Sequence, residues 1–233
     1  MKRMQKGFTL VEIAIVLVII GLLLGGILKG QEMITQAKIK NVVADFSGVS
    51  AAYYGYQDRY RAIPGDDPNA DTRWAGVPVV VGRGNGVVGG TYNAVCPNPL
   101  VAASAESCHW WDQLRRAGFV AGSGGLQPFN AVTGILGVQT GDGAAVLGPA
   151  LGAAAGVGGF ASLLVCSANL PDKIAIAVDT QMDDGIRTTG TVRGQLQAAP
   201  NPNIVTDATA AAAGGAGSYA ETGTNTYSLC RSL

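Results

Sequence analysis

The sequence is poor in charged residues, aromatic residues and histidine. Charged residues make up 14% of the 233 residues, and 16 lysines and arginines balance 16 aspartates and glutamates. A chain without a basic excess has little to attract nucleic acid, so no specific nucleic-acid partner is predicted. Aromatic residues make up only 6% of the chain, whereas glycine occurs 34 times. This balance indicates a loop-rich domain in which turns fix much of the backbone.

The scarcity of histidine also argues against an enzyme. His109 is the sole histidine, and no serine or cysteine stands near a second catalytic partner in a known arrangement. Residues 84–89 formally match the glycine pattern of dinucleotide-binding loops. No periodic apolar segment follows them, although a phosphate cradle needs a helix to begin there. We therefore expect neither catalysis nor a bound cofactor.

The four cysteines favour disulfides over a metal site. They stand at Cys96, Cys108, Cys166 and Cys230, with no pair at zinc-like spacing. If the domain is exported, three pairings are open, and we favour Cys96 with Cys108 and Cys166 with Cys230. Nested or crossed links would require more of the fold to be in place first. Four reduced, buried thiols are the alternative.

One long apolar run stands out near the N-terminus. Residues 8–28 are apolar or small apart from Thr9 and Glu12, and as a helix they would cross a bilayer core of about 30 Å. Lys2, Arg3 and Lys6 precede the run and should keep the N-terminus cytoplasmic. Removal of the whole run as a secretory signal is the alternative, but the pattern continues without a break past its small residues.

Glu12 is the informative residue, because a carboxylate in hydrocarbon costs several kcal/mol unless a partner satisfies it. Residues 6–12 (KGFTLVE), followed by the aliphatic run, resemble the prepilin signature of type IV pilins and type II secretion pseudopilins. The resemblance implies that prepilin peptidase, a membrane aspartyl protease, cuts after Gly7 and that the new amine of Phe8 is methylated. It also implies that Glu12 meets this amine on a neighbouring subunit. A plain single-span anchor with a stray glutamate is the alternative.

The same resemblance implies the location and partners of the chain. The precursor would sit in the inner membrane as a single-pass protein, surrounded by lipid, with its head in the periplasm. It would then polymerise with itself or with related subunits through the inner-membrane assembly machinery. The resulting pilus or pseudopilus filament could extend to the cell surface.

Beyond the apolar run the pattern becomes one-sided. Apolar and aromatic residues recur at alternating steps of three and four, which is typical of an amphipathic helix: Ile39, Val42, Phe46, Val49, Tyr53, Tyr56 and Tyr60. No proline occurs before Pro64, so the pattern predicts helix over residues 8–60. The predicted organisation is a cleaved leader (1–7), a transmembrane helix (8–28), a stalk helix (29–61) and a globular head (62–233).

The head begins with a turn that carries a candidate calcium site. The glycine and prolines of residues 64–68 force the chain away from the helix. Asp67, Asn69 and Asp71 then alternate as the first oxygen ligands of a calcium loop would. The glycine and the distal glutamate of a calcium-hand loop are missing, although major pseudopilins do bind calcium in a head loop. A solvated Asx-turn cluster is the alternative.

Several short elements are predicted in the head. Residues 77–81 read as a strand, and Ser104 should cap a helix over about 105–117 with Trp110, Leu114 and Ala117 buried. Residues 173–179 alternate like a strand and should form a hairpin with residues 187–192. The predicted fold is therefore α+β: a long N-terminal helix packed on a small antiparallel sheet with long glycine-rich loops.

Two low-complexity segments complete the head. Residues 143–165 are rich in glycine and alanine, which raises the alternative of a second membrane span. Pro149 and the many glycines count against that span, and it would leave Cys166 and Cys230 in a reducing compartment. Residues 208–217 should form an exposed loop closed by the Cys230 link.

Three functions remain open at this stage. The first is a subunit of a type IV pilus, for which a C-terminal cysteine loop is typical. The second is a type II secretion pseudopilin, because the Pro-Gly-Asp turn and residues 111–118 resemble a subset of pilin-like proteins often grouped with those. The third, from a different class, is a membrane-tethered periplasmic binding module.

Overall fold

The computed structural model describes residues 9–80, 82–141, 160–197 and 218–233. Their elements follow in chain order: α1 (Leu10–Tyr60), α2 (Ala70–Arg73), α3 (Glu106–Arg116), β1 (Leu136–Thr140), β2 (Leu163–Pro171), α4 (Asp172–Met182), β3 (Val192–Gln197) and β4 (Thr226–Ser232). The chain divides into two compact units, one ending at Lys38 and the other comprising Ile39–Leu233. The predicted α+β class is confirmed.

Helix α1 runs for 51 residues without a break, as the absence of proline predicts. Its end at Tyr60 matches the prediction, while the predicted start at Phe8 lies outside the described residues. In the second unit, one face of α1 enters the core: Val42, Phe46 and Tyr56 are fully buried. The predicted amphipathic stripe is therefore confirmed, with Tyr60 half-buried at its end.

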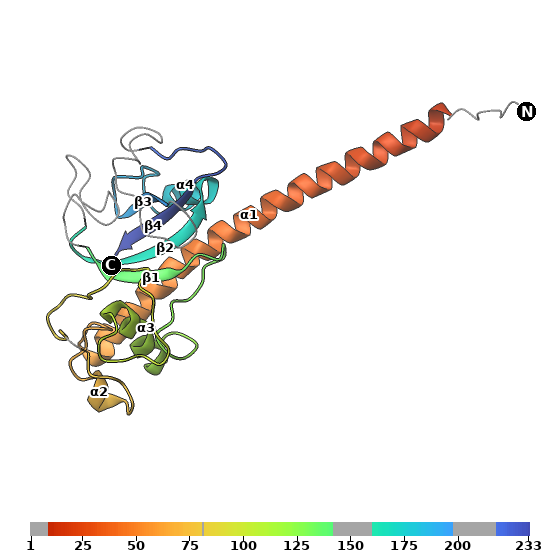
Figure 1. The fold of residues 1–233 in the computed structure, drawn as a ribbon. Coiled ribbons are helices and arrows are strands. Elements are labelled where there is room, and N and C mark those ends of the chain that lie inside the picture. Colours follow the sequence, from red (N-terminus) through yellow and green to blue (C-terminus); the bar gives the residue numbers. More distant parts are fainter. Residues whose placement is uncertain (1–8, 81, 142–159, 198–217) are drawn as a thin grey trace, which may run out of the picture. The chain divides into compact units, whose positions relative to one another are not determined.

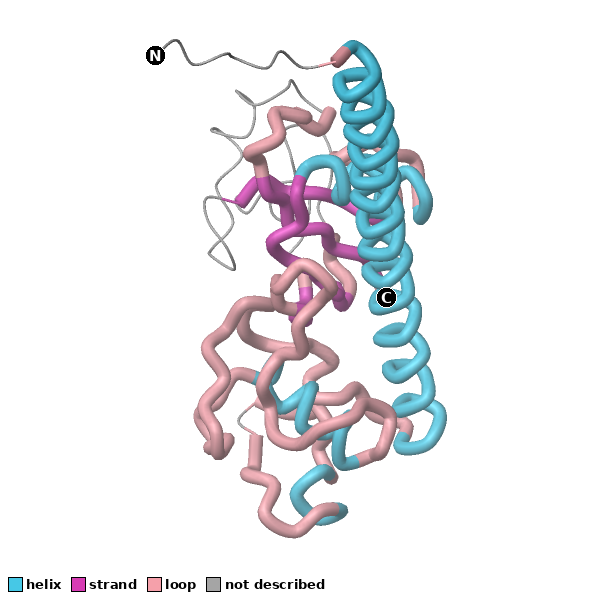
Figure 2. The backbone as a smooth tube through the Cα atoms, turned by 90° about the vertical axis from the view of Figure 1, so that its right-hand side faces the viewer, coloured by secondary structure: helices cyan, strands magenta, loops and turns pink. Residues whose placement is uncertain are grey.

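The head sheet has four antiparallel strands in the order β1-β2-β4-β3 (Figure 1). Strand β2 lies inside the sheet and is buried over most of its length, which suits its run of Leu, Val, Cys and Ala. Figure 2 shows the strands gathered together, whereas the segment that holds α2 and α3 is mostly loop. This division agrees with the many glycines in the sequence.

The two faces of the sheet bury different sets of residues. On one face, Val165, Leu170 and Leu229 share a hydrophobic core with α1, α3 and α4. On the other, Leu164, Cys166 and Cys230 form a smaller cluster with Tyr92. Alternate residues of a strand point to opposite faces, so neighbouring positions of β2 serve both clusters.

The predicted hairpin between residues 173–179 and 187–192 is wrong, because the first segment belongs to helix α4. Residues 173–179 are helical, and residues 187–191 form turns before β3, which pairs with β4. The run Ile-Ala-Ile-Ala-Val fits a period of two, but alanine is small enough for either face and the run is too short to decide. Ile174, Ala175 and Val178 are buried with helical spacing. Pro171 precedes the helix and Asp172 lies in its first turn, as at many helix starts.

Two further local predictions are wrong. Residues 77–80 contain no strand, because β-branched residues form a strand only where a partner strand is available. Helix α3 lies within the predicted range, but Ala105 occupies its N-cap without a side-chain hydrogen bond. Ser104 instead accepts a hydrogen bond from the N–H of Val101 at 3.0 Å. Trp110 and Leu114 are fully buried as predicted, and Ala117 is half-buried.

Two predicted segments fall largely outside the description. Residues 142–159 and 198–217 are not described, so the exposed loop expected at residues 208–217 stays a prediction. Residues 163–165, the end of the alternative second span, belong to β2. Among the described residues, α1 is the helix long and apolar enough to cross a membrane.

The buried face of α1 predicts a large difference between two aromatic truncations. Phe46→Ala removes a fully buried ring and should lower the free energy of unfolding by about 3–5 kcal/mol. Tyr54→Ala, at a side chain that is 54% exposed, should cost about 1 kcal/mol or less. Thermal unfolding of the full chain in detergent, followed by near-UV circular dichroism, measures both. Equal losses would contradict the burial of this face in the core.

Candidate functional sites in the N-terminal helix and the head

Glu12 takes part in a capping box at the start of α1. Its carboxylate oxygen Oε2 accepts hydrogen bonds from the backbone N–H of Thr9 at 2.8 Å and from the Thr9 hydroxyl at 2.9 Å. The Glu12 N–H in turn donates to the Thr9 hydroxyl oxygen at 3.3 Å. This reciprocal pair satisfies two donors that every helix start leaves without partners. The carboxylate is thus held at the end of the helix.

The residues around Glu12 form an apolar and exposed surface. Leu10 is 86% exposed, and apolar side chains continue on all sides of the helix to Leu28. The most apolar window of α1 has a mean hydropathy of 2.8 and no buried residue. Nineteen helical residues, 10–28, span about 28 Å, which matches the hydrocarbon core of a bilayer. Lipid or other helices must cover this surface.

The predicted processing residues lie just before the described part of the chain. Gly7 and Phe8 belong to residues 1–8, which the structure does not describe. Cleavage after Gly7 and methylation of Phe8 therefore stay predictions.

The cysteines pair as the sequence favoured. Cys96 joins Cys108, and Cys166 joins Cys230. The first link ties the loop before α3 to the first turns of that helix. The second connects directly opposite positions of β2 and β4, on the sheet face away from the main core. A link across 64 residues restricts the unfolded chain and stabilises the head by about 3–5 kcal/mol.

The candidate calcium ligands are engaged by arginines. Asp67 is fully buried, forms an ion pair with Arg73 and accepts a hydrogen bond from the Tyr56 hydroxyl at 2.6 Å. Burial raises the pKa of Asp67, but the hydrogen bonds from Arg73, Tyr56 and the Asn69 N–H outweigh burial and lower it. Asp71 pairs with Arg83. A calcium ion would have to displace both arginines, and the calcium site stays a prediction.

Next to Asp67, a second aspartate organises the glycine-rich loop. The buried carboxylate of Asp66 accepts hydrogen bonds from the N–H groups of Gly84, Asn85 and Gly86. The loop that formally matched a phosphate cradle therefore holds a carboxylate of its own chain. Glu106 acts similarly on Gly89, whose N–H donates to it at 2.6 Å, and burial raises the pKa of this carboxyl.

The Pro-Gly-Asp turn is fastened to α3. The Gly65 N–H donates to the Gln113 side-chain oxygen at 2.6 Å. Gly65 has φ of 86°, and a Cβ there would approach the Glu106 carbonyl oxygen to 2.6 Å. Only glycine fits this left-handed, crowded position. The turn and residues 111–118, which resemble segments of the same pilin-like subset, therefore meet in space.

His109 lies inside the head, where the hydrogen-bond partner of its ring among the described residues is a backbone carbonyl. Its side chain is fully buried, its Nε2 lies 3.2 Å from the Val101 carbonyl oxygen, and burial lowers its pKa. Burial and the contact with a backbone carbonyl give this imidazole a structural environment.

An acidic cluster lies at the end of α4, between the two segments that were predicted to form a hairpin. Carboxylate oxygens of Asp179, Asp183 and Asp184 lie within 4.8 Å of one another. Asp179 is fully buried and accepts a hydrogen bond from the Tyr219 hydroxyl at 2.5 Å. Burial, and to a lesser extent the neighbouring carboxylates, raise the pKa of Asp179 to about 6. The i, i+4 spacing of Asp179 and Asp183 could have revealed the cluster, had the segment been recognised as helical.

Comparison with known proteins gives one match. The family model described as "Prokaryotic N-terminal methylation motif" matches residues 2–28. No curated protein and no solved structure matches the chain. The match covers the apolar run with Gly7, Phe8 and Glu12 and ends before the head.

The raised pKa of Asp179 predicts a specific pH dependence. Between about pH 4 and pH 6 the unfolded chain loses this proton while the folded chain keeps it, so the free energy of unfolding falls as pH rises. Asp179→Asn still accepts the Tyr219 hydroxyl and carries no charge. The variant should be more stable than the parent by about 1–3 kcal/mol at pH 7 and nearly equal at about pH 4.

Chemical unfolding at the two pH values measures this difference. Asp58→Asn, at an exposed position of α1, is the control and should show no such pH-dependent gain. If Asp179→Asn had the same free energy of unfolding as the parent at pH 7, the interpretation of Asp179 as a buried, charged aspartate would be wrong.

Proposed function

We propose that this chain, whose N-terminal residues carry the signature of type IV pilins and pseudopilins, is a structural subunit of a type IV pilus filament. The motif match over residues 2–28 is the observation that carries the proposal. The exposed apolar surface of residues 10–28 supports it, because lipid can cover that surface in the precursor and neighbouring helices in a filament. The role is structural and not catalytic.

Processing prepares the helix for assembly. Prepilin peptidase removes residues 1–7 from the membrane-anchored precursor, and the amine of Phe8 becomes the N-terminus. This amine then lies one residue before Thr9, next to the capping box that holds the Glu12 carboxylate. The amine of Phe8 and the carboxylate of Glu12, the two groups that pair between subunits, therefore both lie at the N-terminal end of the helix.

Assembly supplies the partner that Glu12 needs. When helices of several subunits pack together, the Glu12 carboxylate is buried among aliphatic side chains, where an unpaired charge costs several kcal/mol. The methylated amine of a neighbouring subunit neutralises it, and the pair costs far less than either charge alone. Before assembly, the Thr9 hydroxyl of the same chain donates one of the hydrogen bonds that this carboxylate needs. The pairing therefore selects the axial register between subunits.

Two features of the head favour different members of this class. The Cys166–Cys230 link closes a C-terminal loop, as is typical of pilins. The hydrogen bond from Gly65 to Gln113 joins the Pro-Gly-Asp turn to residues 111–118, and both segments resemble those of proteins grouped with secretion pseudopilins. A type II secretion pseudopilin is therefore the second candidate. Electron microscopy of sheared surface fibres, probed with an antibody to this chain, separates the two because a pseudopilus does not normally extend from the cell.

The third candidate is a membrane-tethered periplasmic binding module. Such a protein keeps its helix in the inner membrane and never joins a filament. Sedimentation of the mature chain with filaments supports the subunit proposal, and a chain that stays wholly in the membrane fraction would favour the tethered module.

Two substitutions test processing and assembly separately. Gly7→Ala should block cleavage, because the peptidase acts at this glycine, and the chain should keep the mass of the precursor. Glu12→Ala should still be cleaved, but the filament yield should fall at least about tenfold, since it leaves a buried amine without its partner. Mass spectrometry reports cleavage, and the sheared filament fraction reports assembly.

The matched control is Glu32→Ala. Glu32 lies on the same helix and pairs with Lys29 at 2.7 Å, with both side chains exposed. This variant should be processed and assembled like the parent. Normal maturation of Gly7→Ala would defeat the proposal, and equal assembly of the Glu12 and Glu32 variants would defeat the charge-pair step.

A further inference from the structure

Helix α3 and the following loop enclose a polar hollow at the surface of the head. Its lining residues are Asp112, Arg115, Arg116, Gly122, Ser123 and Gly124, and its volume is about 220 Å³. A second hollow of about 240 Å³ shares Asp112, Arg116, Ser123 and Gly124 with the first and adds Pro78, Asn98 and Leu100, among others. We call the two hollows together the arginine groove. Each hollow has room for several water molecules or for part of a small ligand.

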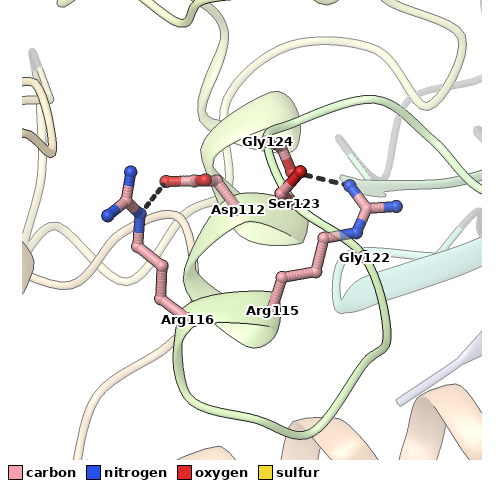
Figure 3. A pocket seen from close by; sticks show the side chains of 6 residues that line it. All are labelled: Asp112, Arg115, Arg116, Gly122, Ser123 and Gly124. Atoms are coloured by element: carbon pink, nitrogen blue, oxygen red, sulfur yellow. Dashed lines mark hydrogen bonds and ion pairs between the residues drawn. The ribbon is translucent and has the colours of Figure 1, made fainter.

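Both guanidinium groups of the groove are held in place by the protein. Arg115 donates to the carbonyl oxygens of Ala121 at 3.2 Å and Gly124 at 2.6 Å. Arg116 donates through Nε to Asp112 at 2.7 Å. Figure 3 shows the two groups on either side of Asp112 and Ser123. Fixed side chains lose little entropy when a ligand binds.

Each arginine keeps donors for a ligand. Arg115 uses Nε and Nη1 for the two bonds given above. Arg116 uses Nε for Asp112, and its Nη1 donates to the Ala75 carbonyl oxygen at 3.5 Å. Nη2 of each arginine therefore makes no hydrogen bond to a described residue. The Arg116 side chain is 35% exposed, whereas that of its partner Asp112 is 5% exposed. The guanidinium group of Arg116 is therefore the more accessible of the pair, and the Asp112 carboxylate beside it also lines the groove.

The charges and polar groups of the groove select a class of ligand. Two guanidinium groups and one carboxylate leave a single net positive charge, which suits a ligand with one carboxylate. Asp112 repels a second anionic group but accepts hydrogen bonds from hydroxyl groups. Asn98 and Ser123 add further partners for hydroxyl groups, and Pro78 and Leu100 offer an apolar contact. A carboxylate flanked by hydroxyl groups on a compact ring fits these demands.

We propose that the arginine groove binds an acidic saccharide, with a uronic-acid carboxylate on Arg116 and sugar hydroxyl groups on Asp112, Ser123 and Asn98. The lining residues include no aromatic side chain on which a nucleic-acid base could stack. The groove also lies beside α3 and its loop instead of along a strand edge, where an extended peptide would add a strand. This inference concerns the head and holds for a pilus subunit and a pseudopilin alike.

Three matched ligands test the chemistry. Methyl glucuronide carries the carboxylate and the hydroxyl groups, methyl glucoside replaces the carboxylate by a neutral group, and acetate lacks the sugar. Calorimetric titration of the full chain in detergent should give a Kd of about 1 mM for the glucuronide. The glucoside and acetate should each bind at least about tenfold more weakly, since each lacks one half of the recognised group. The proposal would be overturned if the glucoside or acetate bound as tightly as the glucuronide, or if the glucuronide showed no saturable binding.

Variants place the binding in the groove. Arg116→Gln should weaken glucuronide binding at least about tenfold, but it also removes the partner of Asp112. Ser123→Trp provides a second test, because Ser123 is exposed and a large ring there fills the groove without removing a contact of the fold. Arg59→Gln, at an exposed position of α1, should bind like the parent. Unchanged binding by Ser123→Trp, with an unchanged melting temperature, would show that the saccharide binds elsewhere.

Discussion

The whole molecule depends on one helix that must bury two different surfaces. Residues 10–28 of α1 are apolar on every side apart from Glu12, and no described residue covers them. From Ile39 onward only one face is apolar, and that face contributes Val42, Phe46 and Tyr56 to the core of the head. The one-sided face that begins at Ile39 packs α1 into the core of the head. The exposed apolar residues 10–28 of the same helix need to be covered by lipid or by other helices. Glu12 interrupts the first surface with a carboxylate that whatever covers the helix must satisfy.

The head compensates for a small sheet with buried carboxylates. Four strands leave much of the backbone in loops, whose N–H groups need partners when they are buried. Asp66 supplies such partners to residues 84–86, and Glu106 does so for Gly89. Asp67 joins Arg73 and Tyr56, so the turn after α1 is tied to the helix itself. These acids fix the loop over residues 84–89 and the turn that follows α1.

The sequence was informative wherever a pattern was long or chemically unusual. The stripe from Ile39 to Tyr56 repeats often enough to define a helix and its buried face, and few pairings were open to four cysteines. Residues 173–179 misled because alanine fits either face of a helix or a strand. Asp66 is bonded by residues 18 to 20 positions along the chain, and Asp67 by Tyr56 and Arg73, 11 and 6 positions away, and no local pattern specifies these partners. The arginine groove likewise depends on how a loop returns beside α3.

The central claim is that this chain is matured as a filament subunit. Mass spectrometry of the N-terminal peptide, prepared from cells that produce the protein, tests it most directly. The account predicts a mature chain that begins at Phe8 and carries one methyl group on its amine. A mature chain that still begins at Met1, or one that has lost the whole of residues 1–28, would contradict it.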